Sequence, residues 1–132
     1  MTKTGTLPEQ RHLAIRVMPG PADTNASGDI FGGWMMSQVD IAGGIVARRR
    51  AQGRIVTVAV NAFQFHQPIF VGDLISCYAE IIRVGRTSLT VHVEAYAERR
   101  GDRGECIQVT EADVTYVAVD ENRRPRPLPR SD

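Results

Sequence analysis

The periodicity of the apolar residues changes close to Gly53, after a long helical pattern. Before that point, from Phe31 to Ala47, apolar side chains recur every three or four positions, which predicts one long helix with one buried face. After it, four segments have the composition and alternation of strands. These segments span about 54–66, 73–84, 87–98 and 105–119, and a shorter one at 12–17 precedes the helix. One long helix beside several long strands is buried most simply when a curved antiparallel sheet wraps it.

This pattern predicts an α+β fold in a single domain. The 132 residues are enough for one core. We assign that domain to 1–132, with flexible ends at about 1–10 and 121–132, because the second of these is rich in proline and arginine. Strands of this length leave an unpaired edge, which proteins commonly cover with a second copy. We therefore expect a homodimer.

Composition and charge argue against several classes of function for this chain. The net charge is +1, so no field from the whole chain attracts nucleic acid or a membrane surface. No apolar run approaches the roughly 20 residues of a membrane span, and the first ten residues lack the apolar core of a signal peptide. We expect a cytoplasmic protein with no nucleic-acid partner. Cys77 and Cys106 lie in predicted strands without metal-ligand spacing, so we expect buried free thiols.

Two glycines stand where the predicted helix begins, in the run GDIFGGWMMSQVDIAGG. At a helix start the backbone N–H groups lack partners within the helix, and the helix dipole favours negative charge there. Without side chains, Gly32 and Gly33 let a carbonyl oxygen approach these amides, as an oxyanion site requires. The alternative is a structural role, in which the glycines allow a tight entry into the helix or close contact with the sheet.

Asp40 lies two turns further along the same helix, about 10–12 Å from the Gly33 amide. No cation lies one turn away, and a buried carboxylate without a partner is costly. Asp40 therefore suits a general base or nucleophile in an apolar cleft, with the small residues Gly43 and Gly44 making room for a substrate. The alternative is a carboxylate at the border of the apolar stripe that reaches water. An oxyanion site with one carboxylate indicates acyl transfer to water.

Three motifs follow one another in the chain: PADTNASGDIFGGWMMSQVDIAGG, VTVAVNAFQFHQPIFVGD and VGRTS. Together they resemble the hotdog-fold acyl-CoA thioesterases of the YciA and brain acyl-CoA hydrolase type, over about residues 12–120. The resemblance implies a hotdog fold with two protomers joined edge to edge, commonly as a trimer of dimers, which is a hexamer. It also implies active sites at the dimer interface that hydrolyse acyl-CoA to free acid and CoA without metal or cofactor.

The resemblance also suggests roles for single residues. Asp40 matches the catalytic aspartate of the family. Asn25 matches an asparagine that works with this aspartate from the opposite half of the site, although alone it is a common loop former. Gly32 and Gly33 match glycines whose amides polarise the thioester carbonyl.

The same resemblance suggests residues that bind substrate. The turn with Arg86, Thr87 and Ser88 matches a segment that binds CoA, and Arg86 suits a phosphate. As a bare sequence this turn is a hairpin with a solvated arginine. Thr57 is a candidate hydroxyl in the site, although the preference of threonine for strands explains it equally well.

Two other functions remain open at this stage. A hotdog hydratase or dehydratase needs a catalytic histidine in the helix region, and residues 30–47 contain none. A non-catalytic acyl-CoA-binding module resembles the enzymes but lacks the acid, whereas this chain keeps Asp40. His66 invites assignment as a general base, but no acidic residue near it in sequence would orient it.

Overall fold

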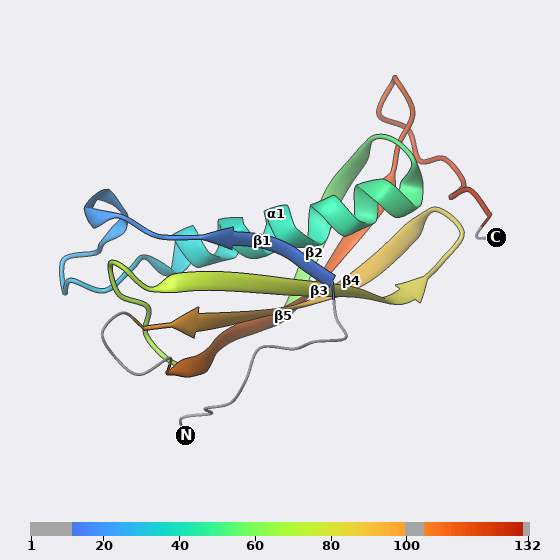
Figure 1. Ribbon diagram of the computed structural model, residues 1–132. Coiled ribbons are helices and arrows are strands. Elements are labelled where there is room, and N and C mark those ends of the chain that lie inside the picture. Colours follow the sequence, from blue (N-terminus) through green and yellow to red (C-terminus); the bar gives the residue numbers. More distant parts are fainter. Residues whose placement is uncertain (1–11, 100–104, 131–132) are drawn as a thin grey trace.

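A computed structural model describes residues 12–99 and 105–130, with a single long helix on a five-stranded sheet (Figure 1). The elements are β1 (His12–Val17), a 3-10 turn (Pro21–Asp23), α1 (Gly32–Ala51), β2 (Ile55–Phe65), β3 (Leu74–Val84), β4 (Ser88–Glu98) and β5 (Cys106–Ala118). The helix and strands predicted from the change in periodicity are confirmed. No helix in the described part of the chain has the length and apolar character needed to cross a membrane.

The sheet is antiparallel throughout, with the strand order β1-β3-β4-β5-β2. It curves around α1, which lies along one of its faces (Figure 1). The α+β hotdog architecture predicted from the sequence is therefore confirmed. Among the described strands, β2 pairs only with β5, so its outer edge is unpaired. Three valines of this edge strand are exposed: Val56, Val58 and Val60.

The core lies between α1 and the face of the sheet that it covers. Met35, Val39 and Ala42 form the buried stripe of the helix. Against them pack alternate residues of β4, which are Leu89, Val91, Val93, Ala95 and Ala97. Each large buried side chain contributes roughly 1.5–3 kcal/mol to the free energy of unfolding. The intervening residues of β4 point to the opposite face of the sheet, because side chains alternate along a strand.

The end of α1 is tied to the segment that follows β5. The Arg126 guanidinium donates hydrogen bonds to the backbone carbonyls of Ala51 and Val119, both at 3.0 Å. Arg50 donates to the carbonyl of Pro129 at 2.6 Å. The bond to Ala51 satisfies a carbonyl that the helix end leaves without a partner, and the other two bonds hold the C-terminal segment in place. Residues 1–11 and 131–132 lie outside the described residues, and the flexibility predicted for 1–10 and 121–132 stays a prediction.

Both cysteines are buried and free, as the sequence indicated. Burial raises the pKa of the Cys77 thiol from 9.0 to about 12. Burial also raises the pKa of Cys106, and the charge of Glu98 adds to the effect. Two thiols that stay protonated are poor nucleophiles, so neither is suited to form an acyl-enzyme.

Candidate active site

Asp40 is held by two hydroxyl groups from the sheet. The Thr57 hydroxyl donates a hydrogen bond to Asp40 Oδ1 at 2.8 Å. The Tyr116 hydroxyl donates to the backbone carbonyl of Asp40, also at 2.8 Å. The carboxylate is half-buried beside the exposed Thr57, so water can reach it. Asp40 thus has one oxygen fixed by the protein and stays accessible, as a general base or nucleophile must be.

Tyr116 is the site residue that sequence reasoning missed. Its side chain is only 1% exposed, beneath the helix. Burial raises the pKa of Tyr116, and the nearby charge and hydrogen bond of Asp40 raise it further, so the hydroxyl stays protonated and donates. The sequence feature that could have indicated this contact is the glycine pair at positions 43 and 44, because glycines in a helix let another element pack closely against it.

The role predicted for Gly43 needs correction. A Cβ on Gly43 would overlap the Tyr116 hydroxyl and lie 3.2 Å from its ring carbons Cε1 and Cζ. Gly43 is also buried, so it faces the tyrosine and not a substrate cleft. Gly44 is half-buried, and a Cβ there would make ordinary contacts with Tyr116 and Ile55. Gly43 therefore lets β5 approach the turn of α1 that carries Asp40.

The start of α1 has no side-chain cap. Phe31 occupies the N-cap position without a side-chain hydrogen bond, and no acidic residue stands in the first turn. The described hydrogen bonds give no acceptor for the amides of Gly32 and Gly33. Both glycines are exposed, and a Cβ on Gly33 would meet open space. A Cβ on Gly32 would lie 3.2 Å from Cζ of Phe65. Gly32 therefore also allows the close contact with the sheet that the sequence left open as its structural role.

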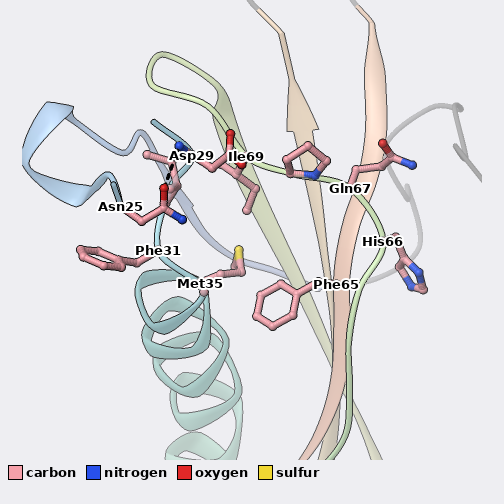
Figure 2. Close-up of a pocket in the computed structure, with 11 residues that line it drawn as sticks. Asn25, Asp29, Phe31, Met35, Phe65, His66, Gln67 and Ile69 are labelled. Carbon is pink, nitrogen blue, oxygen red and sulfur yellow. Dashed lines mark hydrogen bonds between the residues drawn. The ribbon is translucent and has the colours of Figure 1, made fainter. Parts of the chain in front are cut away.

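A pocket of about 300 Å³ opens at this helix start (Figure 2). It lies between the helix, the loop before it and the segment after β2. Its lining comprises Asn25, Asp29, Ile30, Phe31, Gly32, Met35, Phe65, His66, Gln67, Pro68 and Ile69. The apolar side chains are in the majority, and the polar ones are Asn25, Asp29, His66 and Gln67. Such a lining suits an apolar chain with polar groups to be oriented at its end.

Asn25 is fixed by its own loop. Its side-chain oxygen accepts hydrogen bonds from the backbone amides of Ser27 at 2.9 Å and Asp29 at 3.1 Å. Figure 2 shows the second of these bonds, with the Asn25 side chain at the mouth of the pocket. Because the oxygen is engaged, the amide N–H groups are what Asn25 offers to a ligand.

Within one protomer the predicted residues form separate groups. Asn25 and Gly32 line the pocket at the start of α1, with Gly33 beside it. Asp40 and Thr57 lie about 12 Å further along the helix, since eight residues separate Gly32 from Asp40.

The turn predicted to bind CoA lies at the other end of the helix. The backbone carbonyl of Thr87 accepts from Ala118 and that of Arg86 accepts from Leu128, both at 2.9 Å. The Arg86 side chain is exposed, while Thr87 and Ser88 are half-buried. One chain therefore does not assemble all these groups around a single point.

His66 has an acidic partner that its sequence neighbours do not reveal. Its Nε2 lies 2.7 Å from Glu111 Oε2, in β5. The two residues are 45 positions apart, and the register of the sheet brings them together. No acidic residue lies near His66 in sequence, but the fold supplies Glu111 as a partner that can orient its ring. The ring lies beside the pocket in Figure 2, directed away from its centre.

Comparison with known proteins identifies the family to which this chain is similar. Residues 27–103 match the model of the thioesterase superfamily. The acyl-CoA thioester hydrolase YciA of Salmonella typhimurium is 47% identical over 122 residues, which is 91% of this chain and 92% of the relative.

Solved structures agree with this match. A hexameric thioesterase from Yersinia pestis superimposes with a TM-score of 0.88 at 48% identity, covering 95% of this chain and all of that one. A mutant of a hexameric broad-specificity acyl-coenzyme A thioesterase superimposes with a TM-score of 0.89 at 46% identity, covering 93% of this chain and 90% of that one.

Proposed function

The chain belongs to the thioesterase superfamily, and we propose that it hydrolyses acyl-CoA thioesters to free carboxylic acid and CoA. The observation that carries this function is the accessible Asp40 carboxylate, with Oδ1 fixed by Thr57, on a helix whose first amides have no cap. Relatives of high identity over nearly the whole chain are acyl-CoA thioester hydrolases, which supports the same substrate class.

The proposed chemistry uses the carboxylate and the helix start in different roles. The backbone amides of Gly32 and Gly33 polarise the thioester carbonyl and stabilise the oxyanion that forms on it. Asp40 acts in one of two ways, as a base that takes a proton from water or as a nucleophile that forms an anhydride. In both routes a water oxygen ends in the carboxylic acid and the thiolate of CoA leaves. Neither route calls for a metal or a cofactor.

A second protomer unites the two halves of this site. If the free edges of two β2 strands pair antiparallel about a two-fold axis, the start of one strand lies beside the end of the other. Thr57 lies near the start of β2 and the pocket lies at its end. Asp40 of one protomer therefore faces the Asn25 pocket of its partner. The exposed valines of β2 support this edge as the interface.

Larger assembly and CoA recognition extend the same proposal. Several solved relatives are hexamers, and a trimer of dimers is the assembly we propose for this chain. The exposed Arg86, with Thr87 and Ser88, is proposed to bind the phosphates of CoA, because guanidinium and hydroxyl groups are good phosphate donors.

The test is release of free CoA thiol from a panel of acyl-CoAs, with wild type beside Asp40→Asn and Asp40→Ala. We expect hydrolysis by the wild type and a loss of at least about a hundredfold in each folded variant, as for an essential acid–base group. Circular dichroism and oligomer size are the controls. A wild-type protein that binds acyl-CoA without releasing thiol contradicts the proposal and favours a binding module. Hydration of enoyl-CoA without thiol release favours a hydratase.

A further inference from the structure

The face of the sheet that turns away from α1 carries a group of titratable side chains on β4 and β5. His92 and Glu94 are two residues apart in β4, so they point to the same face. The register pairs His92 with Asp113 and Glu94 with Glu111 in β5. Four neighbouring positions of this face therefore hold one imidazole and three carboxylates, and none belongs to the active site described above.

Three ligand atoms of this group converge. His92 Nε2 lies 3.0 Å from Glu94 Oε2 and 3.8 Å from Glu111 Oε1. One ligand atom from each of the three residues falls within 4.8 Å of the others. In a tetrahedral zinc site, bonds of about 2.0–2.1 Å place neighbouring ligand atoms roughly 3.3 Å apart. Small side-chain rotations therefore bring these three atoms to metal-binding distances.

In each of these three side chains, the second nitrogen or oxygen atom contacts another residue. His92 Nδ1 lies 2.7 Å from Asp113 Oδ1. Glu94 Oε1 accepts a hydrogen bond from the Tyr96 hydroxyl at 2.8 Å. Glu111 Oε2 lies 2.7 Å from His66 Nε2. A histidine that ligates a metal commonly donates its other nitrogen to a carboxylate, which fixes the ring and its tautomer. His92 has this arrangement.

We propose that His92, Glu94 and Glu111 bind a divalent transition-metal ion of the zinc class on the face of the sheet opposite the helix. One imidazole and two carboxylates suit Zn²⁺, with water completing the coordination. All three side chains are partly buried, with 21%, 13% and 28% of their surface exposed, so an ion can enter from solvent.

The role of this ion is structural. Glu94 and Glu111 are directly opposite each other across two strands, and like charges in that position destabilise a sheet. A divalent cation bound between them offsets this repulsion and links β4 to β5. The sheet separates the site from Asp40, because α1 packs on the other face. Asp40 and the proposed metal site therefore lie on different faces of the sheet, and metal binding is testable without hydrolysis, although Glu111 contacts His66 at the edge of the pocket.

A proton is the competing cation. Burial lowers the pKa of His92, but hydrogen bonds to Asp113 and Glu94 and the charges of these carboxylates outweigh it, so the pKa lies above 6.5. Metal binding to Nε2 then releases a proton. Binding is best measured at about pH 8, where this competition is weaker.

The experiment is calorimetric titration of ZnCl₂ into full-length protein freed of metal with EDTA. We expect one Zn²⁺ per protomer, and visible absorption bands of tetrahedral geometry when Co²⁺ replaces it. His92→Gln is expected to weaken binding by at least about a hundredfold, and Asp113→Asn by about 10–100-fold through loss of the residue that orients the ring. The melting temperature of the wild type is expected to rise with Zn²⁺.

The matched control is His12→Gln, which makes the same change at an exposed histidine of β1 outside the cluster. It should bind Zn²⁺ as the wild type does. Absence of stoichiometric binding to the wild type overturns the proposal. Binding that is unchanged in folded His92→Gln also overturns it. If His92→Gln does not fold, the affinity of folded Asp113→Asn for Zn²⁺ is the test, since that variant keeps the three proposed ligands. An unchanged affinity then overturns the proposal.

Discussion

Thr57 and Tyr116 are direct partners across β2 and β5, and both donate hydrogen bonds to Asp40. Thr57 binds the side chain of Asp40, whereas Tyr116 binds its backbone carbonyl. The two bonds act at different points of one residue, so they restrain both the position of the helix turn and the rotation of the carboxylate. The placement of Asp40 thus depends on one cross-strand pair.

Loss of the Thr57 hydroxyl should reduce catalysis without unfolding the protein. We expect Thr57→Val to lower kcat by about 10–100-fold, because the carboxylate of Asp40 would no longer be held in one orientation and a small misplacement of a reacting group is costly. The Thr57 side chain is exposed, so the free energy of unfolding should fall by no more than about 1 kcal/mol. Steady-state kinetics measure kcat, and urea unfolding measures the free energy of unfolding. Thr57→Ser keeps the hydroxyl and is expected to retain most activity; equal losses in the two variants would contradict this role.

Gly43 and Tyr116 should be coupled in stability. Gly43→Ala places a methyl group against the Tyr116 hydroxyl, and overpacking of this kind costs about 1–3 kcal/mol. Tyr116→Phe removes the obstructing oxygen, so the double variant should be more stable than the sum of the two single changes predicts. Urea unfolding of the four proteins measures this coupling. Strictly additive effects would show that the hydroxyl is not the obstacle.

Two inactive variants should complement each other if the site is shared between protomers. We expect Asp40→Asn and Asn25→Ala each to be nearly inactive alone. After mixed refolding, half of the dimers contain one chain of each kind, and each of these has one intact site of two. Activity should therefore recover to about one quarter of wild type. Thiol release from the mixture, compared with each variant refolded alone, gives the answer. No recovery from dimers shown to be mixed would place Asn25 and Asp40 in the same protomer's site, and full activity of Asn25→Ala alone would make Asn25 dispensable.

Cys77 should resist thiol reagents in the folded protein. Its pKa is raised to about 12 from 9.0, so very little thiolate exists at neutral pH, and its side chain is fully buried. An aromatic disulfide reagent should label it in urea but not in buffer, with Cys77→Ala identifying the signal. Because the folded pKa is the higher one, this thiol contributes stability below about pH 9 that is lost as the pH rises toward 12. Fast labelling of the native protein would contradict the assigned burial.

The fold was predictable from the sequence because periodicity reports directly on which face of an element is buried. The helix pattern placed α1, and the alternation within 87–98 placed β4. Asp40 and the glycines of the helix start were also accessible to sequence reasoning, because a lone mid-helix aspartate and paired glycines violate helix preferences. Their catalytic roles stay predictions until activity is measured.

The contacts of the site were not predictable, because they depend on strand register between distant segments. Tyr116 lies 76 positions after Asp40, and nothing in a buried strand residue indicates which helix turn it meets. Gly43 was interpreted as space for substrate for the same reason, since the tyrosine that fills that space comes from β5. Likewise, His66 and Glu111 meet only after β2 and β5 pair.

The strict alternation of β4 also limits how this chain can vary in length. A single residue inserted or deleted between Leu89 and Ala97 would exchange the two faces for the rest of the strand. Valines would then face outward, and His92 or Glu94 would enter the packed layer beneath the helix. Insertions and deletions are therefore tolerable in the loops that join the strands but not within this one. The spacing of its residues is as constrained as their identities.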